Sequence, residues 1–578
     1  MNTAITDFAD WRRSVSATGR LRAFNDAGVL EASDVLVAQR LCALAKEPDE
    51  PVALAVALVV RAVRGGSVCL DLGTVARQVG QPGLPWPEPA AWLRAVAGSV
   101  LAGDPPVLHL DGGLLYLDRY WIEERRVAED VAALAAAHRT GTAPEARRLF
   151  PDGFAEQRAA AEVALSRALT VLTGGPGTGK TTTVARLLAL LAEQSELDRR
   201  PRPRIALAAP TGKAAARLLE AVRAEVAQLD PVDQARLPAL SATTLHRLLG
   251  SRPDTRSRFR HNRDNRLPHD VIVVDETSMV SLTMMARLLE AVRPESRLVL
   301  VGDPDQLASV DAGAVLADMV EGLESAPGSP VARLVTPHRF GESIGALAGA
   351  IRDGDADAAL EVLAAGGDHI EWVRDGDATG VLRKVVVPHA LRLREAAVLG
   401  DADEALRTLD RHRMLCAHRR GPYGVAYWNR QIERWLAEQT DSPLWAPWYP
   451  GRPVLVTAND YGLGLYNGDT GVAVLRDSGL RAVMAGAGGA VELATGRLSD
   501  IETMHAMTIH KSQGSQATEV TVLLPTEDSR LLTRELLYTA VTRAREKVRV
   551  IGTAEQLRAA VGRRAVRATG LARRLRTG

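Results

Sequence analysis

Leu169-Thr-Val-Leu-Thr-Gly-Gly-Pro-Gly-Thr-Gly-Lys-Thr-Thr-Thr-Val184 is the stretch on which the fold of this chain depends. An apolar, β-branched run ends in a glycine-rich turn, and an amphipathic helix is expected to follow. Gly174 and Gly179 are separated by four residues and followed by Lys180 and Thr181, which is the full spacing of a phosphate-binding P-loop. Glycines let successive backbone N–H groups surround phosphate oxygens at the positive end of the helix. The pattern predicts a nucleotide site in which Lys180 reaches the β- and γ-phosphates and Thr181 holds Mg²⁺.

The whole turn belongs to this prediction. We expect ATP to be bound by Gly174, Gly175, Pro176, Gly177, Thr178, Gly179, Lys180, Thr181 and Thr182.

A carboxylate for the metal ion is expected at the end of a neighbouring strand. Val271-Ile-Val-Val-Asp275-Glu276 supplies four apolar residues followed by two acids. We expect Asp275 to hold Mg²⁺, directly or through water, and Glu276 to orient and deprotonate the attacking water. Gln306 follows another apolar run and is placed to sense the γ-phosphate, although an ordinary strand-to-helix turn has the same pattern.

Arginines from a second domain would complete such a site, because they stabilise charge on the transferring phosphoryl group. Two candidates stand out, Arg339 in Thr336-Pro-His-Arg-Phe340 and Arg543 in Tyr538-Thr-Ala-Val-Thr-Arg543. Either arginine could instead form a surface ion pair, and spacing does not decide between these interpretations.

Composition limits the class of protein. The chain has 578 residues, too many for one core, so we expect about three to five domains. Lys and Arg number 71 against 70 for Asp and Glu, so any nucleic-acid contact must come from local patches. The three cysteines share no metal-ligand spacing, and neither a signal peptide nor a membrane-spanning run is visible. We therefore expect a cytoplasmic protein.

The expected pattern of helices and strands changes along the chain. Residues 1–135 read as mostly helical and hold no catalytic constellation, which favours a partner-docking domain. From 136 onward strands alternate with helices, which predicts α/β layers with parallel sheets. We expect one α/β domain at 136–340, with the ATP site, and another formed by 341–435 and 505–578. Short strands and Gly-rich turns at 436–504 predict a small β-barrel insertion.

Two arginine-rich segments each allow two interpretations. The segment 252–266 carries six arginines with Phe259 and His261, and is either a hairpin near a duplex junction or a partner-facing loop. The tail 563–576 is either a solvated helix or a surface for an acidic partner.

Taken in order, these segments resemble the motif set of superfamily one helicases. The resemblance runs through Gln157 (the adenine-reading Q motif), 209–215 (motif Ia), 242–246 (Ib), Asp275-Glu276 (II), 302–306 (III), 338–340 (IV), 508–515 (V) and 539–543 (VI). Within that superfamily, the P-loop together with 24–30 and 465–471 resembles the RecD family, the alpha subunit of exodeoxyribonuclease V (RecBCD).

The resemblance implies an architecture and an activity. It implies two RecA-like P-loop motor domains, a helical N-terminal domain and an SH3-like barrel insertion. It also implies an ATP- and Mg²⁺-dependent helicase that moves five-prime to three-prime on single-stranded DNA from DNA ends, beside RecB and RecC subunits in double-strand break repair. No acidic cluster resembling a nuclease centre is visible, so we expect nuclease activity in another subunit.

In this superfamily single-stranded DNA crosses the tops of both α/β domains. The matching positions carry hydroxyl, ammonium and imidazole groups, which bind phosphate without reading sequence. We expect DNA contacts from Thr211, Lys213, Thr243, His246, Thr508 and His510. His246 and His510 could equally be hydrogen-bonded structural histidines. Gln516 stands where several relatives have a ribose-binding glutamate, which argues against a nucleotide contact there.

Two other functions fit parts of the pattern. A stand-alone RecD-like helicase would usually carry helix-hairpin-helix repeats in a longer N-terminal region, and none is evident in residues 1–135. A non-catalytic scaffold that binds nucleotide only for assembly would not need intact Lys180, Asp275, Glu276 and Arg543. We therefore expect the motor subunit of a RecBCD-type enzyme.

Overall fold

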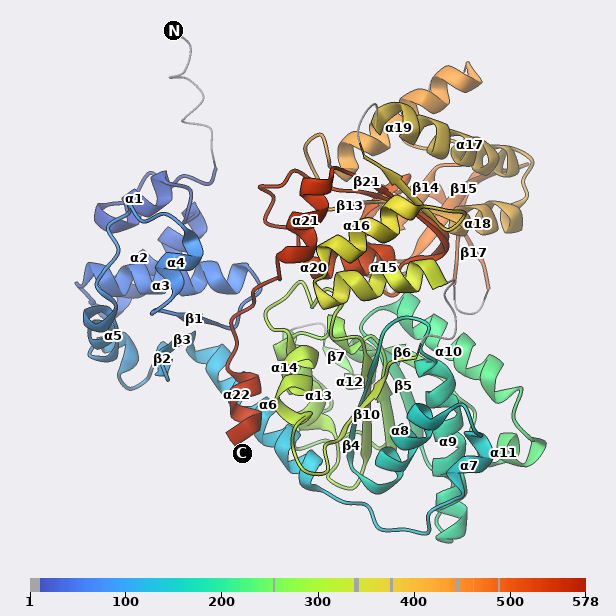
Figure 1. Ribbon diagram of the computed structural model, residues 1–578, viewed down its shortest axis with the longest axis horizontal. Coiled ribbons are helices and arrows are strands. Elements are labelled where there is room, and N and C mark those ends of the chain that lie inside the picture. The colour runs from blue at the N-terminus through green and yellow to red at the C-terminus, as the bar shows by residue number, and fades with distance from the viewer. Residues whose placement is uncertain are drawn as a thin grey trace.

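The computed structural model describes residues 11–252, 255–336, 342–374, 378–441, 446–460, 462–486 and 489–577. These residues form an N-terminal lobe and two α/β lobes, seen at the left, lower right and upper right of Figure 1. The two α/β lobes are built on parallel sheets, which confirms the predicted α/β class.

The N-terminal lobe packs helices against a small antiparallel sheet with the strand order β1-β3-β2. Its elements are α1 (Gly19–Asp26), α2 (Ala32–Ala45), α3 (Glu50–Arg64), β1 (Cys69–Asp71), α4 (Val75–Val79), α5 (Pro89–Ala97), η2 (Val100–Ala102), β2 (Leu108–Asp111) and β3 (Leu114–Leu117). Strands β2 and β3 pair antiparallel as a hairpin. Its turn residues Gly112 and Gly113 both have positive φ, as a tight two-residue turn requires. Helix α6 (Asp118–Ala136) then leads toward the first α/β lobe.

The first α/β lobe follows α6 in the chain. Its elements are α7 (Ala146–Leu149), α8 (Ala155–Ser166), β4 (Leu169–Gly174), α9 (Lys180–Leu197), β5 (Ile205–Ala209), α10 (Gly212–Val226), α11 (Pro231–Arg236), β6 (Ala242–Thr244), α12 (Leu245–Leu249), β7 (Ser251–Arg252), β8 (Thr255–Phe259), β9 (Val271–Val274), η3 (Thr277–Met279), α13 (Leu282–Ala291), β10 (Arg297–Gly302), α14 (Val315–Leu323) and β11 (Val331–Leu334).

The sheet of this lobe has the order β11-β4-β10-β9-β5-β6, and every pair is parallel. The strand predicted before the two acids is confirmed as β9. Because β4, β10 and β9 are neighbours and run in one direction, the loops that follow them lie side by side at one edge. That edge therefore collects the P-loop, the two acids and Gln306.

The second α/β lobe comprises α15 (Glu342–Asp353), α16 (Ala356–Ala365), β12 (Ile370–Val373), α17 (Ala378–Val398), α18 (Ala402–Arg411), β13 (His412–Cys416), α19 (Val425–Thr440), β19 (Ala506–Thr508), η5 (His510–Ser512), β20 (Ala517–Leu523), α20 (Arg534–Val541), β21 (Ala544–Ile551) and α21 (Ala554–Gly562). Its parallel sheet has the order β12-β21-β20-β13-β19.

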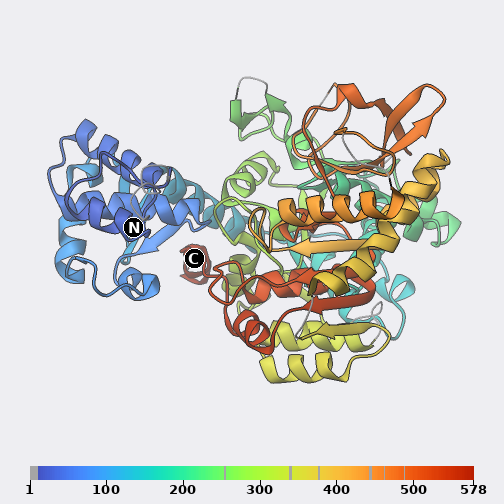
Figure 2. The ribbon, with the colours of Figure 1, turned by 90° about the horizontal axis from the view of Figure 1, so that it is seen from above.

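An antiparallel sheet is inserted between α19 and β19. It has the order β17-β16-β15-β14-β18, formed by β14 (Pro453–Val456), β15 (Thr470–Arg476), β16 (Gly479–Met484), β17 (Val491–Ala494) and β18 (Ile501–Thr503), with η4 (Thr495–Arg497) before the last strand. In the view of Figure 2 this orange insertion lies on the side of the two α/β lobes away from the N-terminal lobe.

The end of the chain returns to the first lobe. Helix α22 (Leu571–Thr577) packs against α14 and α6, and Leu571 and Leu575 join the core around the first parallel sheet. The expected range 505–578 placed this tail with the second α/β lobe. The structure separates it because the apolar face of α22 is buried against α14.

The acidic partner considered for the basic tail lies within the chain itself. Arg574 contacts Glu124 and Asp111, and Arg573 also contacts Asp111.

All three cysteines, Cys42, Cys69 and Cys416, are buried and free. Among the described residues, no helix is both long and apolar enough to cross a bilayer.

Candidate nucleotide pocket and adjoining groove

The loop between β4 and α9 has the backbone geometry of a phosphate cradle. Gly177 and Gly179 adopt positive φ, which residues with a side chain rarely do. Lys180 opens α9, and its Nζ donates to the carbonyl oxygens of Gly174 at 2.7 Å and Gly175 at 2.9 Å. The ammonium group therefore lies across the loop, within reach of an anion that enters it.

The two acids after β9 occupy strained and partly buried positions. Glu276 has a φ of 51°, in the left-handed region that costs a non-glycine residue about 1–3 kcal/mol. Its backbone N–H donates to Asp275 Oδ1 at 2.8 Å. Burial and the neighbouring Glu276 charge raise the pKa of Asp275, although Lys180 and Arg217 oppose the change. A cation beside Asp275 would offset this penalty.

Gln306 lies in the loop after β10 and is incompletely hydrogen-bonded. Its Nε2 donates to Asp303 Oδ2 at 3.0 Å, and Tyr538 of α20 donates to the same oxygen at 3.0 Å. Its Oε1 is buried without a hydrogen-bond partner among the described residues. A buried acceptor left unpaired costs about 1–3 kcal/mol, so the side chain is suited to a donor brought by a ligand or a bound water.

The same loop is fastened to the second α/β lobe. The Leu307 N–H donates to Thr539 Oγ1 at 2.9 Å, and Gln513 Nε2 donates to the Leu307 carbonyl at 2.6 Å. A change around Gln306 is therefore transmitted directly to segments of the second lobe.

These segments enclose a cavity of about 280 Å³ between the two α/β lobes. Its lining includes the following predicted residues: Pro176, Gly177, Gly179, Lys180, Thr181, Thr182, Asp275, Glu276, Gln306 and Arg543. Gly174, Gly175 and Thr178 complete the loop behind it. Gln157 is buried, and its Nε2 donates to the Thr178 carbonyl at 3.3 Å.

Of the two candidate arginines, the structure places one. Arg543 is buried, and its guanidinium donates to the carbonyls of Thr539 at 3.1 Å and Ser515 at 3.3 Å while it lines the cavity. Arg339 lies outside the described residues.

The sequence interpretation missed Arg217, a third arginine at the cavity. It stands four residues after Lys213 on α10, so helical periodicity places the two on one face. That spacing was the available signal. Gln516 also lines the cavity, and its Oε1 accepts from Arg217 at 3.2 Å.

The donor set fits a nucleoside triphosphate with a hard divalent cation. Thr181 and Asp275 offer one hydroxyl and one carboxylate, which suits Mg²⁺ because that ion usually keeps waters and substrate phosphates as its other ligands. Among the described residues, no group of three or more His, Cys, Asp or Glu side chains forms a separate metal site.

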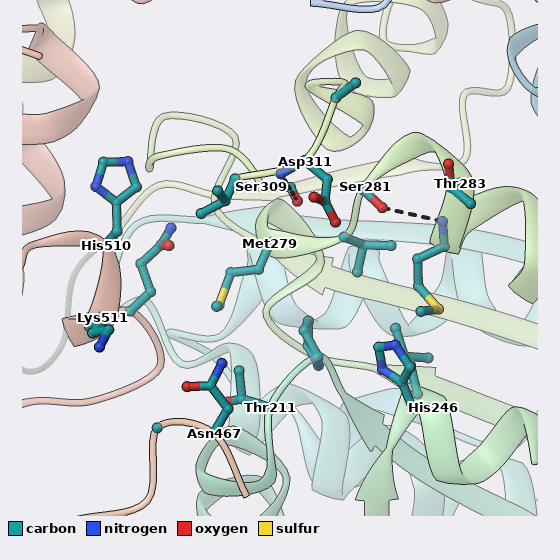
Figure 3. A pocket seen from close by; sticks show the side chains of 18 of the residues that line it. Thr211, His246, Met279, Ser281, Thr283, Ser309, Asp311, Asn467, His510 and Lys511 are labelled. Carbon is teal, nitrogen blue, oxygen red and sulfur yellow. Dashed lines mark hydrogen bonds between the residues drawn. The ribbon is translucent and has the colours of Figure 1, made fainter. Parts of the chain in front are cut away.

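A second, larger cavity of about 1250 Å³ adjoins the first. Figure 3 shows it with His510 and Lys511 at one end and His246 at the other. Five predicted DNA-contact residues line it, namely Thr211, Lys213, His246, Thr508 and His510. Thr243, the sixth, lies in β6 and is absent from the lining. We call this cavity the groove.

The side chains of the groove keep polar groups in fixed positions. Thr211 Oγ1 accepts from the Ala214 N–H at 3.2 Å and caps α10, while Lys213 Nζ donates to Thr470 Oγ1 of β15 at 3.3 Å. Burial, followed by the charge of Arg413, lowers the pKa of Lys213 to about 8. Burial also lowers the pKa of His246 and of His510, so both imidazoles are mainly neutral hydrogen-bonding groups at pH 7.

The groove concentrates positive charge in a chain whose net charge is only +1. Among the described residues that line it, Asp311 is the one carboxylate. The cations there are Arg64, Arg119, Lys213, Arg287, Arg419 and Lys511. Several of these are paired with acids just outside the groove, such as Lys511 with Glu502 at 2.9 Å. Local charge of this kind suits a polyanion.

The arginine-rich segment borders the groove. Strands β7 and β8 pair antiparallel, and both interpretations, a place near a duplex junction and a partner-facing surface, stay predictions. Phe259 lines the groove and contacts His246 edge-on, with 5.8 Å between the two ring centroids. Arg263 instead turns away and pairs with Asp130 of α6 at 2.7 Å.

Comparison with family models identifies three regions of the chain. Residues 157–312 match an AAA domain, residues 503–551 match a UvrD-like helicase C-terminal domain, and residues 26–116 match the N-terminal domain of RecBCD enzyme subunit RecD.

Individual proteins give the same result. The chain is 72% identical over 550 residues to RecBCD enzyme subunit RecD of Mycolicibacterium smegmatis, with 95% of this chain and 98% of that protein covered. It is 66% identical over 578 residues to the subunit of the same name from Mycobacterium tuberculosis strain H37Rv, with 100% and 99% covered. ATP-dependent RecD2 DNA helicase of Deinococcus radiodurans is 32% identical over 80% of this chain and 59% of its own length. Among solved structures, Bacteroides Pif1 bound to ssDNA has a TM-score of 0.38 at 17% identity and covers 68% of this chain and 91% of its own.

Proposed function

The chain belongs to the RecD family of RecBCD enzyme subunits, and we propose that it moves five-prime to three-prime along single-stranded DNA. It is an ATP-hydrolysing DNA helicase, the motor subunit of an enzyme that contains RecB and RecC and acts in DNA repair and recombination. The observation that carries the proposal is the pair of adjoining cavities, a phosphate-binding pocket and a cationic groove, which share one wall.

The proposal assigns a role to each part of the fold. The range 136–340 is the first RecA-like motor domain, and 341–435 with 505–562 is the second. Residues 436–504 form an SH3-like barrel insertion, and 1–135 is the partner-docking domain. Support comes from the two parallel sheets, from the antiparallel order of the inserted strands, and from the separate core of the N-terminal lobe.

Within the pocket the roles follow from the chemistry of each side chain. Lys180 and the loop amides bind the β- and γ-phosphates, while Glu276 takes the proton of the attacking water. Gln306 senses the γ-phosphate, and Arg543 stabilises negative charge on the transferring group. Arg339 is proposed as a second such arginine, on sequence grounds alone.

The metal ion belongs to the same proposal. Thr181 and Asp275 would hold Mg²⁺, which when bound neutralises charge on the phosphate oxygens. Support comes from Asp275, whose carboxylate lies beside Lys180 with a raised pKa.

In the groove, we assign the DNA backbone to the hydroxyl and cationic groups of both α/β lobes. Thr211 and Lys213 come from one lobe and Thr508 from the other, so a change in the gap between the lobes moves two sets of contacts relative to each other. Unwinding must supply about 1.4 kcal/mol per base-pair step, which cyclic closure around ATP can provide.

The test compares strand separation on duplexes with a five-prime or a three-prime single-stranded tail. The chain is assayed alone and with RecB and RecC, beside Lys180→Gln and a matched control, Lys384→Gln, which changes an exposed lysine of α17. We expect the Lys180-dependent part of the unwinding to require the five-prime tail and to survive in the control.

Other outcomes would replace the proposal. Lys180-dependent unwinding from the three-prime tail would reverse the polarity. Full activity without partners would favour a stand-alone helicase. If wild type and Lys180→Gln were equally inactive while assembly still required nucleotide, the chain would be a scaffold.

A further inference from the structure

A contact between the two α/β lobes, in which α10 meets the loop 508–516, lies between the pocket and the groove. Helix α10 supplies Lys213 to the groove and Arg217 to the pocket. On the other side, the loop 508–516 supplies Thr508 to the groove and Gly514 to the pocket. Anything that changes how this loop sits on α10 therefore reaches both cavities.

Arg217 fastens the loop to the helix. Its Nη1 donates to the carbonyl of Gly514 at 2.9 Å, and its Nη2 donates to Gln516 Oε1 at 3.2 Å. Both acceptors belong to the second lobe, whereas Arg217 belongs to the first. The link is therefore made and broken with the relative position of the lobes.

The backbone of the loop makes a close approach at the same point. Gly514 has a φ of +68°, and a Cβ built on it would lie 3.2 Å from the Cβ of Ala214. The loop thus rests directly on the first turns of α10, where a side chain would hold the surfaces apart. The two hydrogen bonds from Arg217 hold the loop in this position on α10.

Among the described residues, the Arg217 guanidinium has no carboxylate in an ion pair with it, as a purely structural arginine would, and both its acceptors are neutral. Burial and the charge of Arg543 lower its pKa, although the charges of Glu276 and Asp410 oppose the change, so the site penalises the cation overall. An arginine offers five N–H donors, and an anion in the pocket would be a stronger acceptor than a carbonyl or an amide.

We propose that Arg217 is a positioning residue that couples the nucleotide pocket to the groove by holding the loop 508–516 against α10, with nucleotide phosphate competing for its guanidinium. The inference rests on the proposed function. Phosphate in the pocket draws Arg217 from Gly514 and Gln516, and the loop, which carries Thr508, His510 and Lys511, is then free to shift on the groove side.

The test measures how strongly single-stranded DNA stimulates ATP hydrolysis. The full chain is assembled with RecB and RecC, and the rate of the same complex carrying Lys180→Gln is subtracted, which removes hydrolysis by other subunits. Arg217→Gln is compared with Arg217→Lys and with Arg223→Gln. Arg223 lies on the same helix, is exposed, and donates to the Leu240 carbonyl at 2.9 Å, so it is a matched control.

We expect Arg217→Gln to lower the ratio of DNA-stimulated to unstimulated hydrolysis by about tenfold, the effect of losing a hydrogen-bonded charge across an interface. The lysine variant should recover part of the ratio, and the Arg223 variant should keep it. Gln516→Leu should lower the ratio too, and the double variant Arg217→Gln/Gln516→Leu should be no worse than Arg217→Gln alone, because the two residues act through one link.

Two results would overturn the inference. One is a wild-type ratio in Arg217→Gln. The other is an equal fall in stimulated and unstimulated rates, which would make Arg217 a local structural residue of the pocket. If the wild-type complex shows no Lys180-dependent stimulation by DNA, the proposed function itself fails, and the inference fails with it.

Discussion

Two of the buried clusters of charged groups in the described part of the chain are built in opposite ways. One is the nucleotide pocket. The other is the tail clasp, which we define as Tyr116, Glu124, Thr569, Gly570 and Arg574. In the clasp Glu124 is fully buried and accepts four hydrogen bonds, each of 3.0 Å, one from each of the other members. In the pocket, Gln306 Oε1 has no partner among the described residues, and Arg217 faces only neutral acceptors.

The difference distinguishes a structural cluster from a binding site. A carboxylate oxygen accepts about two hydrogen bonds, so the four donors of the clasp leave Glu124 nothing to offer a ligand. In the pocket, by contrast, acceptors and cations have incomplete sets of partners, and the backbone is strained at Glu276. Unmet hydrogen-bonding capacity is costly in a protein interior, so its presence at the edge of a sheet indicates a group that arrives later.

The sharpest test of this comparison removes a pocket cation. Arg543→Gln should lower ATP turnover by about 10³-fold, since an arginine that stabilises the transferring phosphoryl group is worth about 10³–10⁵ in rate. Turnover is measured in the complex, and the melting temperature of the variant shows that it folds. Arg545→Gln, an exposed change two residues along, should keep wild-type turnover. A loss below tenfold in Arg543→Gln would mean that this arginine is structural, like Arg574.

The clasp should respond in stability instead of rate. Glu124→Ala removes the acceptor shared by Tyr116, Thr569, Gly570 and the half-buried Arg574, which keeps its ion pair with Asp111, and should destabilise the attachment of α22 by about 1–3 kcal/mol. Hydrogen exchange of α22 measures this local opening. Arg576→Ala is the control, because Arg576 and Glu321 form an exposed pair at 3.2 Å that is worth at most about 1 kcal/mol. Equal exchange in the two variants would contradict the assigned importance of the clasp.

The last test concerns Asp318, an α14 residue beside the clasp. Burial, opposed by an interaction with the Thr569 side chain and reinforced by the Glu124 charge, raises its pKa to about 8. The folded state therefore holds a proton that the unfolded chain releases near pH 4, and stability should fall as pH rises from about 4 to about 8. Asp318→Asn should flatten this slope in thermal unfolding between those limits. A slope unchanged in the variant would assign the pH dependence to another group.

Local patterns in the sequence predicted the parts of the site that lie within one stretch of chain. The P-loop and the acids after β9 follow from glycine spacing and from an apolar run that ends in two carboxylates. The strand β9 follows from a short apolar run, because strands of a parallel sheet are buried on both faces.

Such local patterns do not predict contacts between segments that are distant in the sequence. The hydrogen bond between Arg574 and Glu124 joins residues 450 positions apart, and the one between Arg217 and Gln516 joins residues 299 apart. Nothing near either residue specifies its partner. Arg217 itself could have been predicted as a pocket residue, because its spacing from Lys213 on α10 is visible in the sequence. Thr243 belongs to a motif-like stretch but lies in β6, outside the groove lining, so its DNA contact stays a prediction.

The return of the tail to α14 has a consequence for biosynthesis. Ribosomes make α14 about 250 residues before α22, yet Leu571 and Leu575 cover part of its apolar face. The first α/β lobe therefore leaves the exit tunnel with an uncovered patch, which stays open while the second lobe and its insertion are still being translated. An exposed apolar surface of that kind is where nascent chains aggregate or recruit chaperones. A premature stop codon after α21 would leave the patch permanently bare, even though every residue of the nucleotide pocket had been made.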